Sequence, residues 1–215
     1  MPNKKYIIFL LFFVISASTM AENSWQLSRD EDEIQIYTRD NPASAVKSFK
    51  GSMVIKSRLA ALVSVIEDTD TYPRWLQDCK AAKSIKKTGN NQVYNYIVTG
   101  MPWPVVDRDA IVHSVLMQNN TNRQVVITLD SAADMIPPKK GMVRIKNLSG
   151  KWLLTPLESG QVNVVYEMNV DPGGNIPKWL VNALAVDLPF FTLQKLRKIV
   201  KEDKYANATV ENITE

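Results

Sequence analysis

The sequence predicts an α+β protein in which a long antiparallel sheet curls around one C-terminal helix. The middle of the chain is a succession of short extended segments separated by polar turns rich in Gly and Asn. Residues 177–200 then repeat apolar side chains at helical spacing. Because strand twist accumulates across many neighbours, a sheet of this length must curl. The terminal helix is its only large apolar partner.

The first 21 residues are typical of an export signal. Two lysines precede an almost wholly apolar run, residues 6–15, and small residues near Ala21 suit cleavage. The run is shorter than the roughly 20 residues that a membrane-spanning helix needs. We therefore expect a signal peptide at 1–21, a single folded domain at 22–205 and a polar tail at 206–215 that frays.

Composition restricts the possible partners and the cellular compartment. The expected mature chain carries 24 Lys and Arg against 22 Asp and Glu, because the export signal holds two of the 26 basic residues. A nucleic-acid site needs a far stronger basic face, so no nucleic-acid partner is expected. Cys79 is the only cysteine, so no internal disulfide can form and the domain depends on its apolar core. We expect an exported monomer, in a bacterial periplasm rather than secreted.

The first part of the mature chain predicts a hairpin followed by a helix. Residues 34–37 and 46–55 favour extended structure, with Gly51 as a bulge. Ser57 is placed to cap the helix, since its hydroxyl can accept from an unpaired amide. Pro73 and Trp75 are expected to end it. Four apolar residues share one face of this helix: Leu59, Leu62, Val63 and Ile66.

A meander of seven strands follows. Their polar connections are too short for parallel returns, so neighbouring strands must be antiparallel. The segment Asn147–Gly150 is expected to be one of the turns. Along 162–170, Tyr166 and Met168 share a face with three valines, and this apolar face should point inward. The predicted strands are 83–87, 92–99, 110–117, 124–129, 142–146, 151–155 and 162–170.

The chain is expected to end in a long amphipathic helix. Pro177 fits the first helical position, where its missing amide costs no hydrogen bond. Pro189 must kink or interrupt the helix, because it lacks a donor and clashes with the carbonyl one turn back. The apolar positions include Leu180, Leu184, Phe190, Leu193, Leu196 and Ile199.

Three segments give the chain a family resemblance. They are PWPVVDRDAIV from Pro102 to Val112, KGMVRI from Lys140 to Ile145, and DPGGNIPKWLVN from Asp171 to Asn182. In this order and spacing they resemble the START family, the StAR-related lipid-transfer domains, over most of the chain. The resemblance implies the START helix-grip fold with an internal apolar tunnel. It also implies a lipid or sterol-like ligand and transient contact with a membrane surface, with no cofactor.

The resemblance also implies that a few polar side chains on the inner face of central strands contact the lipid head group. Asn95 and Ser114 lie on the expected strands beside the PWPVVDRD segment, each among apolar neighbours. The charged pair of several START members is not evident here, which favours a weakly polar ligand such as a sterol. The alternative is that both are buried groups satisfied by the backbone. The predicted lipid-binding residues are Asn95, Ile97, Thr99, Val112, Ser114, Met135, Tyr166, Met168, Phe190 and Leu193.

Other parts of the three segments are expected to be structural. In START domains a loop between two late strands closes the tunnel mouth, which makes residues 131–140 the expected lid, opening together with Phe190 and its neighbour on a membrane. Arg108 and Asp109 must point to opposite faces of their strand, and an ion pair or loop brace suits both. Trp103, between two prolines, is expected to plug the sheet edge by core packing.

Catalysis has little support in the sequence. His113 and Ser114 face opposite sides of one strand, and the single cysteine and histidine have no zinc-site spacing. We therefore expect no catalytic and no metal-binding residue. Two alternatives stay open. The first is an enzyme of the wider superfamily, which includes cyclases and hydrolases, that uses an acid such as Asp109. Its carboxylate and that of Asp107 could share a face, although a structural role suits them better.

The second alternative is a ligand-sensing module that docks on a partner through a basic helix end. Cations at a helix C-terminus are also ordinary, because the helix dipole favours them there. The residues concerned are Lys195, Arg197, Lys198 and Lys201.

Overall fold

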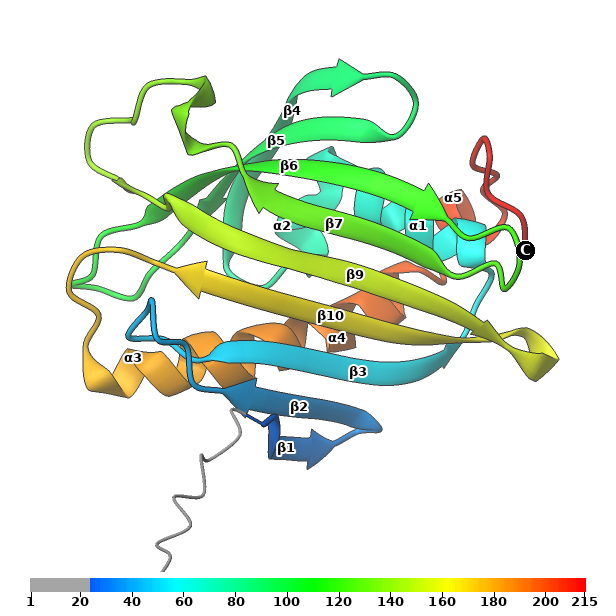
Figure 1. Ribbon diagram of the computed structural model, residues 1–215, viewed down its shortest axis with the longest axis horizontal. Helices are drawn as coiled ribbons and strands as arrows, with labels where there is room; N and C mark the ends of the chain where they lie inside the picture. Colours follow the sequence, from blue (N-terminus) through cyan, green and yellow to red (C-terminus); the bar gives the residue numbers. More distant parts are fainter. Residues whose placement is uncertain (1–23) are drawn as a thin grey trace, which may run out of the picture.

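The structure, a computed structural model that describes residues 24–215, is a ten-stranded sheet wrapped around a long C-terminal helix (Figure 1). The strand order is β1-β2-β3-β10-β9-β7-β6-β5-β4, with the short β8 beside β6. Every pair is antiparallel except β6 and β8. The α+β prediction is confirmed. The expected signal peptide, 1–21, lies outside the described residues.

The strands and helices have the following bounds. The strands are β1 (Gln26–Glu31), β2 (Ile34–Arg39), β3 (Ser48–Lys56), β4 (Cys79–Thr88), β5 (Gln92–Thr99), β6 (Arg108–Gln118), β7 (Val125–Ser131), β8 (Val143–Arg144), β9 (Asn147–Leu157) and β10 (Gln161–Asp171). The helices are α1 (Leu59–Glu67), η1 (Thr69–Thr71), α2 (Tyr72–Trp75), η2 (Ala133–Met135), η3 (Glu158–Gly160), α3 (Lys178–Asn182), η4 (Ala183–Asp187), α4 (Leu188–Ile199) and α5 (Asp203–Ala206).

All nine predicted strands are present, and β5 has the predicted bounds. The prediction missed β1, whose residues are mostly exposed and polar and so carry no apolar alternation. The expected turn at Asn147–Gly150 is wrong, because this segment pairs with the end of β10 as part of β9. Gly150 is needed there for space: a Cβ atom on it would lie 2.2 Å from Met168 Sδ.

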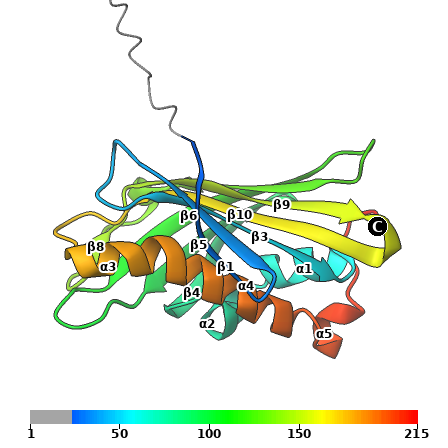
Figure 2. The ribbon, with the colours of Figure 1, turned by 90° about the horizontal axis from the view of Figure 1, so that it is seen from below.

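The long helix lies across the concave side of the sheet, and α1 and α2 cover another part of the same side (Figure 2). Gly51 permits the close approach of α4 to β3, since a Cβ atom on it would lie 2.7 Å from Leu193 Cδ1. The expected bulge at Gly51 is wrong, because the pairing of β3 with β2 and β10 runs through this residue without a shift. Small size, not backbone irregularity, is what this position requires.

Pro189 interrupts the α-helical pattern as predicted. The backbone stays helical from Lys178 to Ile199, but η4 is a π-helical segment just before the proline. A wider turn at this place accommodates a residue that has no amide donor. Pro177 is the N-cap residue rather than the first helical residue, and Lys178 begins α3.

The C-terminal tail docks on the domain, so the expectation that it frays is wrong. The Glu215 carboxylate accepts hydrogen bonds from the amides of Leu59 and Ala60, at 2.8 and 3.2 Å. It thereby satisfies the N-terminus of α1, where the predicted Ser57 cap makes no such bond and Arg58 is the N-cap residue. The proline expected to end that helix instead lies in the first turn of α2.

Candidate functional site

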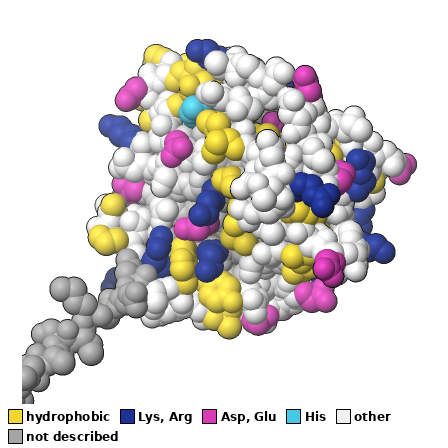
Figure 3. Space-filling view, turned by 45° about the vertical axis from the view of Figure 1, so that its right-hand side comes forward, with side chains coloured by type: hydrophobic (Ala, Val, Ile, Leu, Met, Phe, Trp, Pro, Cys, Tyr) yellow, Lys and Arg dark blue, Asp and Glu magenta, His cyan; other side chains and the backbone are white. Residues whose placement is uncertain are grey.

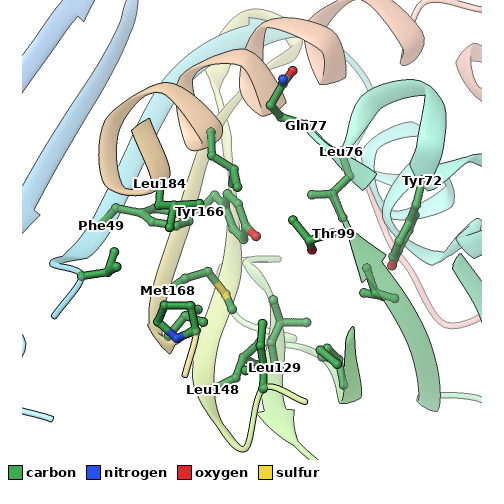
Figure 4. Close-up of a pocket in the computed structure, with 18 of the residues that line it drawn as sticks. Phe49, Tyr72, Leu76, Gln77, Thr99, Leu129, Leu148, Tyr166, Met168 and Leu184 are labelled. Carbon is green, nitrogen blue, oxygen red and sulfur yellow. The ribbon is translucent and has the colours of Figure 1, made fainter. Parts of the chain in front are cut away.

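A cavity lies between the concave face of the sheet and the helices. The space outside protein atoms there is about 1120 Å³, a volume that includes space open to solvent. Strands β3, β5, β6, β7, β9 and β10 contribute to its wall, together with α2 and the long C-terminal helix. Figure 4 shows lining side chains from both layers directed into this space.

One side of the cavity wall is a connected group of aromatic rings. Trp152 and Tyr166 are stacked with ring centroids 3.9 Å apart, and Phe49 meets Tyr166 edge-on at 5.2 Å. Trp75 meets Trp152 edge-on at 6.0 Å and Tyr72 at 5.3 Å. All five residues are buried. Since the rings pack against one another, they form a firm apolar wall that leaves the rest of the cavity open.

Two buried polar side chains enter the cavity wall from β5 and β6. Asn95 is 1% exposed, and its Oδ1 accepts a hydrogen bond of 2.9 Å from the Thr69 hydroxyl. Its amide nitrogen makes no hydrogen bond to any described residue, nor does the hydroxyl of Ser114, which is 7% exposed. The alternative that the backbone satisfies both groups therefore does not hold in this structure.

The tyrosine hydroxyls of the wall are neutral. Tyr72 donates to the carbonyl oxygen of Ile66 at 2.7 Å, whereas the Tyr166 hydroxyl is directed into the cavity in Figure 4. Burial raises the pKa of both tyrosines above the usual value. Among the described lining residues only Lys47 is charged, and it is exposed and paired with Asp40 at 3.3 Å. The enclosed part of the wall is therefore apolar or neutral.

The three segments that carry the resemblance meet at one end of the sheet. Arg108 donates to the carbonyl oxygens of Pro172 and Gly173, at 3.3 and 3.1 Å, and to that of Val106. It is 2% exposed, and burial lowers the pKa of its guanidinium. Arg108 is the expected loop brace, and it holds the segment that leads into the long helix.

Asp109 forms a buried ion pair with Arg144 on the convex side. The two side chains share hydrogen bonds of 3.1 and 2.9 Å. Burial raises the pKa of Asp109, but the bonds and charge of Arg144 outweigh it, so the pKa lies below its usual value. Asp107 has a separate partner, Lys80, at 2.8 Å. Both carboxylates therefore have structural partners, and neither lines the cavity.

The segment predicted as a lid lies elsewhere. Ile136 and Met142 pack against Tyr96, Val98 and Ile111, which form a small apolar cluster on the convex face. Arg144 fixes this segment by donating to three carbonyl oxygens in residues 133–137. No residue of 131–140 lines the cavity, so the expectation that this loop covers the mouth is wrong. Ala132 and Ile136 pack against the outer cluster instead.

The cavity adjoins a further hollow between the β5–β6 loop and the long helix. This hollow of about 390 Å³ shares Gln77, Met101, Leu184 and Leu188 with the cavity and continues it outward. Trp103, in that loop, is 91% exposed, so its predicted role as a core plug is wrong. The prolines on either side hold it in a solvent-facing loop rather than against the sheet.

Seven of the ten predicted lipid-binding residues line the cavity: Asn95, Ile97, Thr99, Val112, Ser114, Tyr166 and Met168. Phe190 and Leu193 are buried in the core but are not among the lining residues, and Met135 is 39% exposed on η2. Trp75 and Trp152 also line the cavity and were not among the predicted residues. Inward alternation in β9 marks Trp152, whereas no pattern marked Trp75 as lining.

Other kinds of site are not evident in residues 24–215. No group of three or more His, Cys, Asp and Glu residues there could hold a metal ion. None of the helices in this range is long and apolar enough to cross a membrane. In the face that Figure 3 shows, basic and acidic side chains are interspersed rather than separated into a basic patch.

Comparison with known proteins places the chain in a family. The sequence profile of the START domain matches residues 14–205. An uncharacterized protein of Pseudomonas aeruginosa is 33% identical over 190 residues, 88% of this chain and 93% of that one. Mouse phosphatidylcholine transfer protein is 27% identical over 164 residues, 74% and 75% of the two chains.

A solved structure gives the same result. The STAR-related lipid transfer protein of Xanthomonas axonopodis has a TM-score of 0.76 and 32% identity, over 83% of this chain and 99% of that one. The helix-grip arrangement described above is the fold that the two proteins share. This chain belongs to the START domain family.

Proposed function

We propose that this protein is a lipid carrier that holds one lipid or sterol-like molecule in the cavity between sheet and helices. The observation that carries the proposal is an enclosed, mostly apolar space whose wall contains a few neutral polar groups. Sites for small molecules usually have this composition. Similarity to proteins named for lipid transfer supports the same proposal.

Exchange of the lipid is proposed to occur at a membrane surface, through the opening beside the β5–β6 loop. Trp103 and Trp179 are 91% and 59% exposed, on this loop and on α3 respectively. Phe191, which lines the outer hollow, is 37% exposed. Tryptophan favours the membrane–water interface, where its ring is partly buried and its N–H stays hydrated. These residues therefore suit the rim of an opening that faces lipid.

A carrier is favoured over an enzyme by the placement of the acidic groups. Asp109, the acid considered for catalysis, is paired with Arg144 on the other side of the sheet. A general acid or base must reach the reacting atoms, and this carboxylate does not line the cavity. The carrier is proposed to act in the periplasm as a monomer. Bulges in β1 and β4, the two edge strands, support the monomer, because they disfavour pairing between sheet edges.

The proposal is tested by lipid extraction and by transfer. The mature protein purified from its host should release a lipid detectable by mass spectrometry, and should speed lipid movement between donor and acceptor vesicles. Val112→Trp would fill the cavity, while Val115→Trp places the same ring on the opposite face of β6. We expect Val112→Trp alone to abolish transfer, at an unchanged circular dichroism spectrum. Equal transfer by both variants would refute a cargo site in the cavity.

A further inference from the structure

We infer that a C-terminal strap, residues 202–215, positions α1, η1 and α2 across the concave side and thereby sets how long a cargo stays bound, without contacting the cargo. The effect on cargo rests on the proposed carrier function, whereas the positioning of the helices does not. Val210 and Ile213 of the strap pack against the main core cluster. The strap ends beside Gln118, at the end of β6 remote from the β5–β6 loop.

The helices that the strap contacts have little support of their own. Between β3 and β4 the chain crosses the concave side as the short elements α1, η1 and α2 (Figure 2). The longest, α1, has nine residues, and an isolated helix of that length is marginal in water. Its N-cap residue, Arg58, makes no side-chain cap, and its first turn holds no acidic residue. The amides at its start therefore need acceptors from another part of the chain.

The strap supplies those acceptors at the start of α1. The Glu215 carboxylate accepts from the amides of Leu59 and Ala60. It also forms an ion pair of 3.1 Å with Arg58, which donates to the carbonyl oxygen of Ala208 at 3.0 Å. A carboxylate is favoured at a helix N-terminus because it accepts from unpaired amides and suits the helix dipole. The end of the strap is thus the missing cap of α1.

The strap is also attached where α1 ends and α2 begins. The hydroxyl of the buried Tyr205 donates to the Asp68 carboxylate at 2.7 Å and lies 3.1 Å from the Thr71 hydroxyl. On α2, Arg74 donates to the Glu202 carboxylate at 2.6 Å. The strap therefore holds both ends of the crossing, and α1 lies between the two attachments.

The crossing carries part of the cavity wall. Tyr72 and Trp75 of α2 line the cavity, and Trp75 packs edge-on against Trp152 of β9. On η1, the Thr69 hydroxyl donates to Asn95 at 2.9 Å. No strap residue lines the cavity. A change in the strap can therefore reach the cargo only by moving or loosening this part of the wall.

Hydrogen exchange tests the positioning of the helices. In Glu215→Ala the amides of residues 59–76 should exchange about tenfold faster, while those of β7 and β9 should not change. Glu211→Ala is the matched control, because this carboxylate belongs to the strap but accepts from Asn90 in the β4–β5 turn at 3.2 Å. Unchanged exchange of residues 59–76 in Glu215→Ala would overturn the inference. Faster exchange throughout the sheet would also overturn it, since that indicates a global loss of stability.

Release of a fluorescent lipid tests the effect on cargo. The probes are dehydroergosterol and a pyrene-labelled phosphatidylcholine, each loaded into the protein and released to an excess of vesicles. Glu215→Ala should release a bound probe about tenfold faster than the wild type, and Glu211→Ala should not. Tyr205→Phe keeps the buried ring and removes only the hydroxyl, so it should speed release by a smaller factor.

The outcomes separate the inference from the carrier proposal. If Glu215→Ala loosens residues 59–76 but releases both probes at the wild-type rate, the strap does not set retention, and the inference fails while the carrier proposal is untouched. If the wild type binds neither probe and co-purifies with no lipid, the carrier proposal fails. The effect on retention then fails with it, and hydrogen exchange alone decides whether the strap positions the helices.

Discussion

Buried polar groups lie on both faces of the sheet, but they are paired on one face and partly unpaired on the other. On the convex face, Asp109 and Arg144 are almost fully buried, charged and joined by two hydrogen bonds. On the concave face, Asn95 and Ser114 are just as buried, but they are neutral and keep donors without partners. Asp109 and Ser114 both lie on β6 with opposite orientations, so the difference between the faces arises within a few residues of sequence.

This contrast separates the structural from the functional use of polarity. The paired charges hold the 131–146 segment and β8 against the sheet, because Arg144 also donates to loop carbonyls. A buried group whose partners are all supplied by the protein has nothing left for a ligand. An unpaired group in a cavity wall has unused hydrogen-bonding capacity. The concave face is therefore where we place the cargo site.

The largest expected effect comes from breaking the convex pair. Asp109→Ala leaves the Arg144 guanidinium buried without its counter-charge, and this should lower the free energy of unfolding by about 3–5 kcal/mol. Urea denaturation followed by tryptophan fluorescence measures the change. The affinity of the remaining folded protein for its lipid should stay close to that of the wild type, since Asp109 does not line the cavity.

A double variant provides the control for this experiment. In Asp109→Leu with Arg144→Met, both charges are replaced by apolar side chains, so no unpaired charge remains buried. The double variant should be more stable than Asp109→Ala. If the single variant is as stable as the wild type, the pair does not hold the 131–146 segment against the sheet. The proposal that buried polar groups are structural on the convex face and functional on the concave face is then contradicted.

A smaller effect is expected from acid. The pKa of Asp109 in the folded protein lies below its usual value, because Arg144 outweighs burial. Its stabilising contribution is therefore complete above the unfolded-state pKa of about 3.9 and is lost as the pH falls through the folded-state pKa. The difference in unfolding free energy between wild type and Asp109→Asn should shrink below about pH 4. A difference that stays constant from pH 7 to pH 2.5 would contradict this assignment.

Much of the fold was predictable because local patterns determine it. Alternating side chains identified β10 and its inward residues Tyr166 and Met168, and the apolar repeat identified the terminal helix with its break before Pro189. The predictions were wrong where residues distant in the sequence determine the local structure. Gly51 and Gly150 resemble a bulge and a turn in sequence, but each is small because a side chain from another element lies above it. Only the tertiary packing shows this.

The cavity wall was partly predictable for the same reason. Asn95 and Ser114 stand out as polar residues among apolar ones within strands, and the structure places both in the wall. The position of the 131–140 loop was not predictable, because its apolar residues fit a lid and an outer cluster equally well. The exposure of Trp103 was not predictable from residue type alone, because a tryptophan is equally suited to a core and to an exposed rim.

The smallest effect on stability, and the sharpest on function, is expected at the rim of the opening. Trp103→Ala and Trp179→Ala remove exposed rings, so each should change the free energy of unfolding by no more than about 0.5 kcal/mol. Their combination should lower partitioning to lipid vesicles and slow lipid transfer, because the rings are proposed to enter the membrane interface. Flotation of the double variant with vesicles measures the first effect.

The matched control for the rim lies on another part of the surface. Met117 is 52% exposed on the convex side of β6, so Met117→Ala removes a comparably exposed apolar side chain away from the opening. This variant should bind vesicles and transfer lipid as the wild type does. Equal partitioning of all variants would show that the exposed tryptophans do not contact the membrane. The opening would then have to receive its cargo by collision with free lipid, and transfer would no longer depend on the acceptor surface.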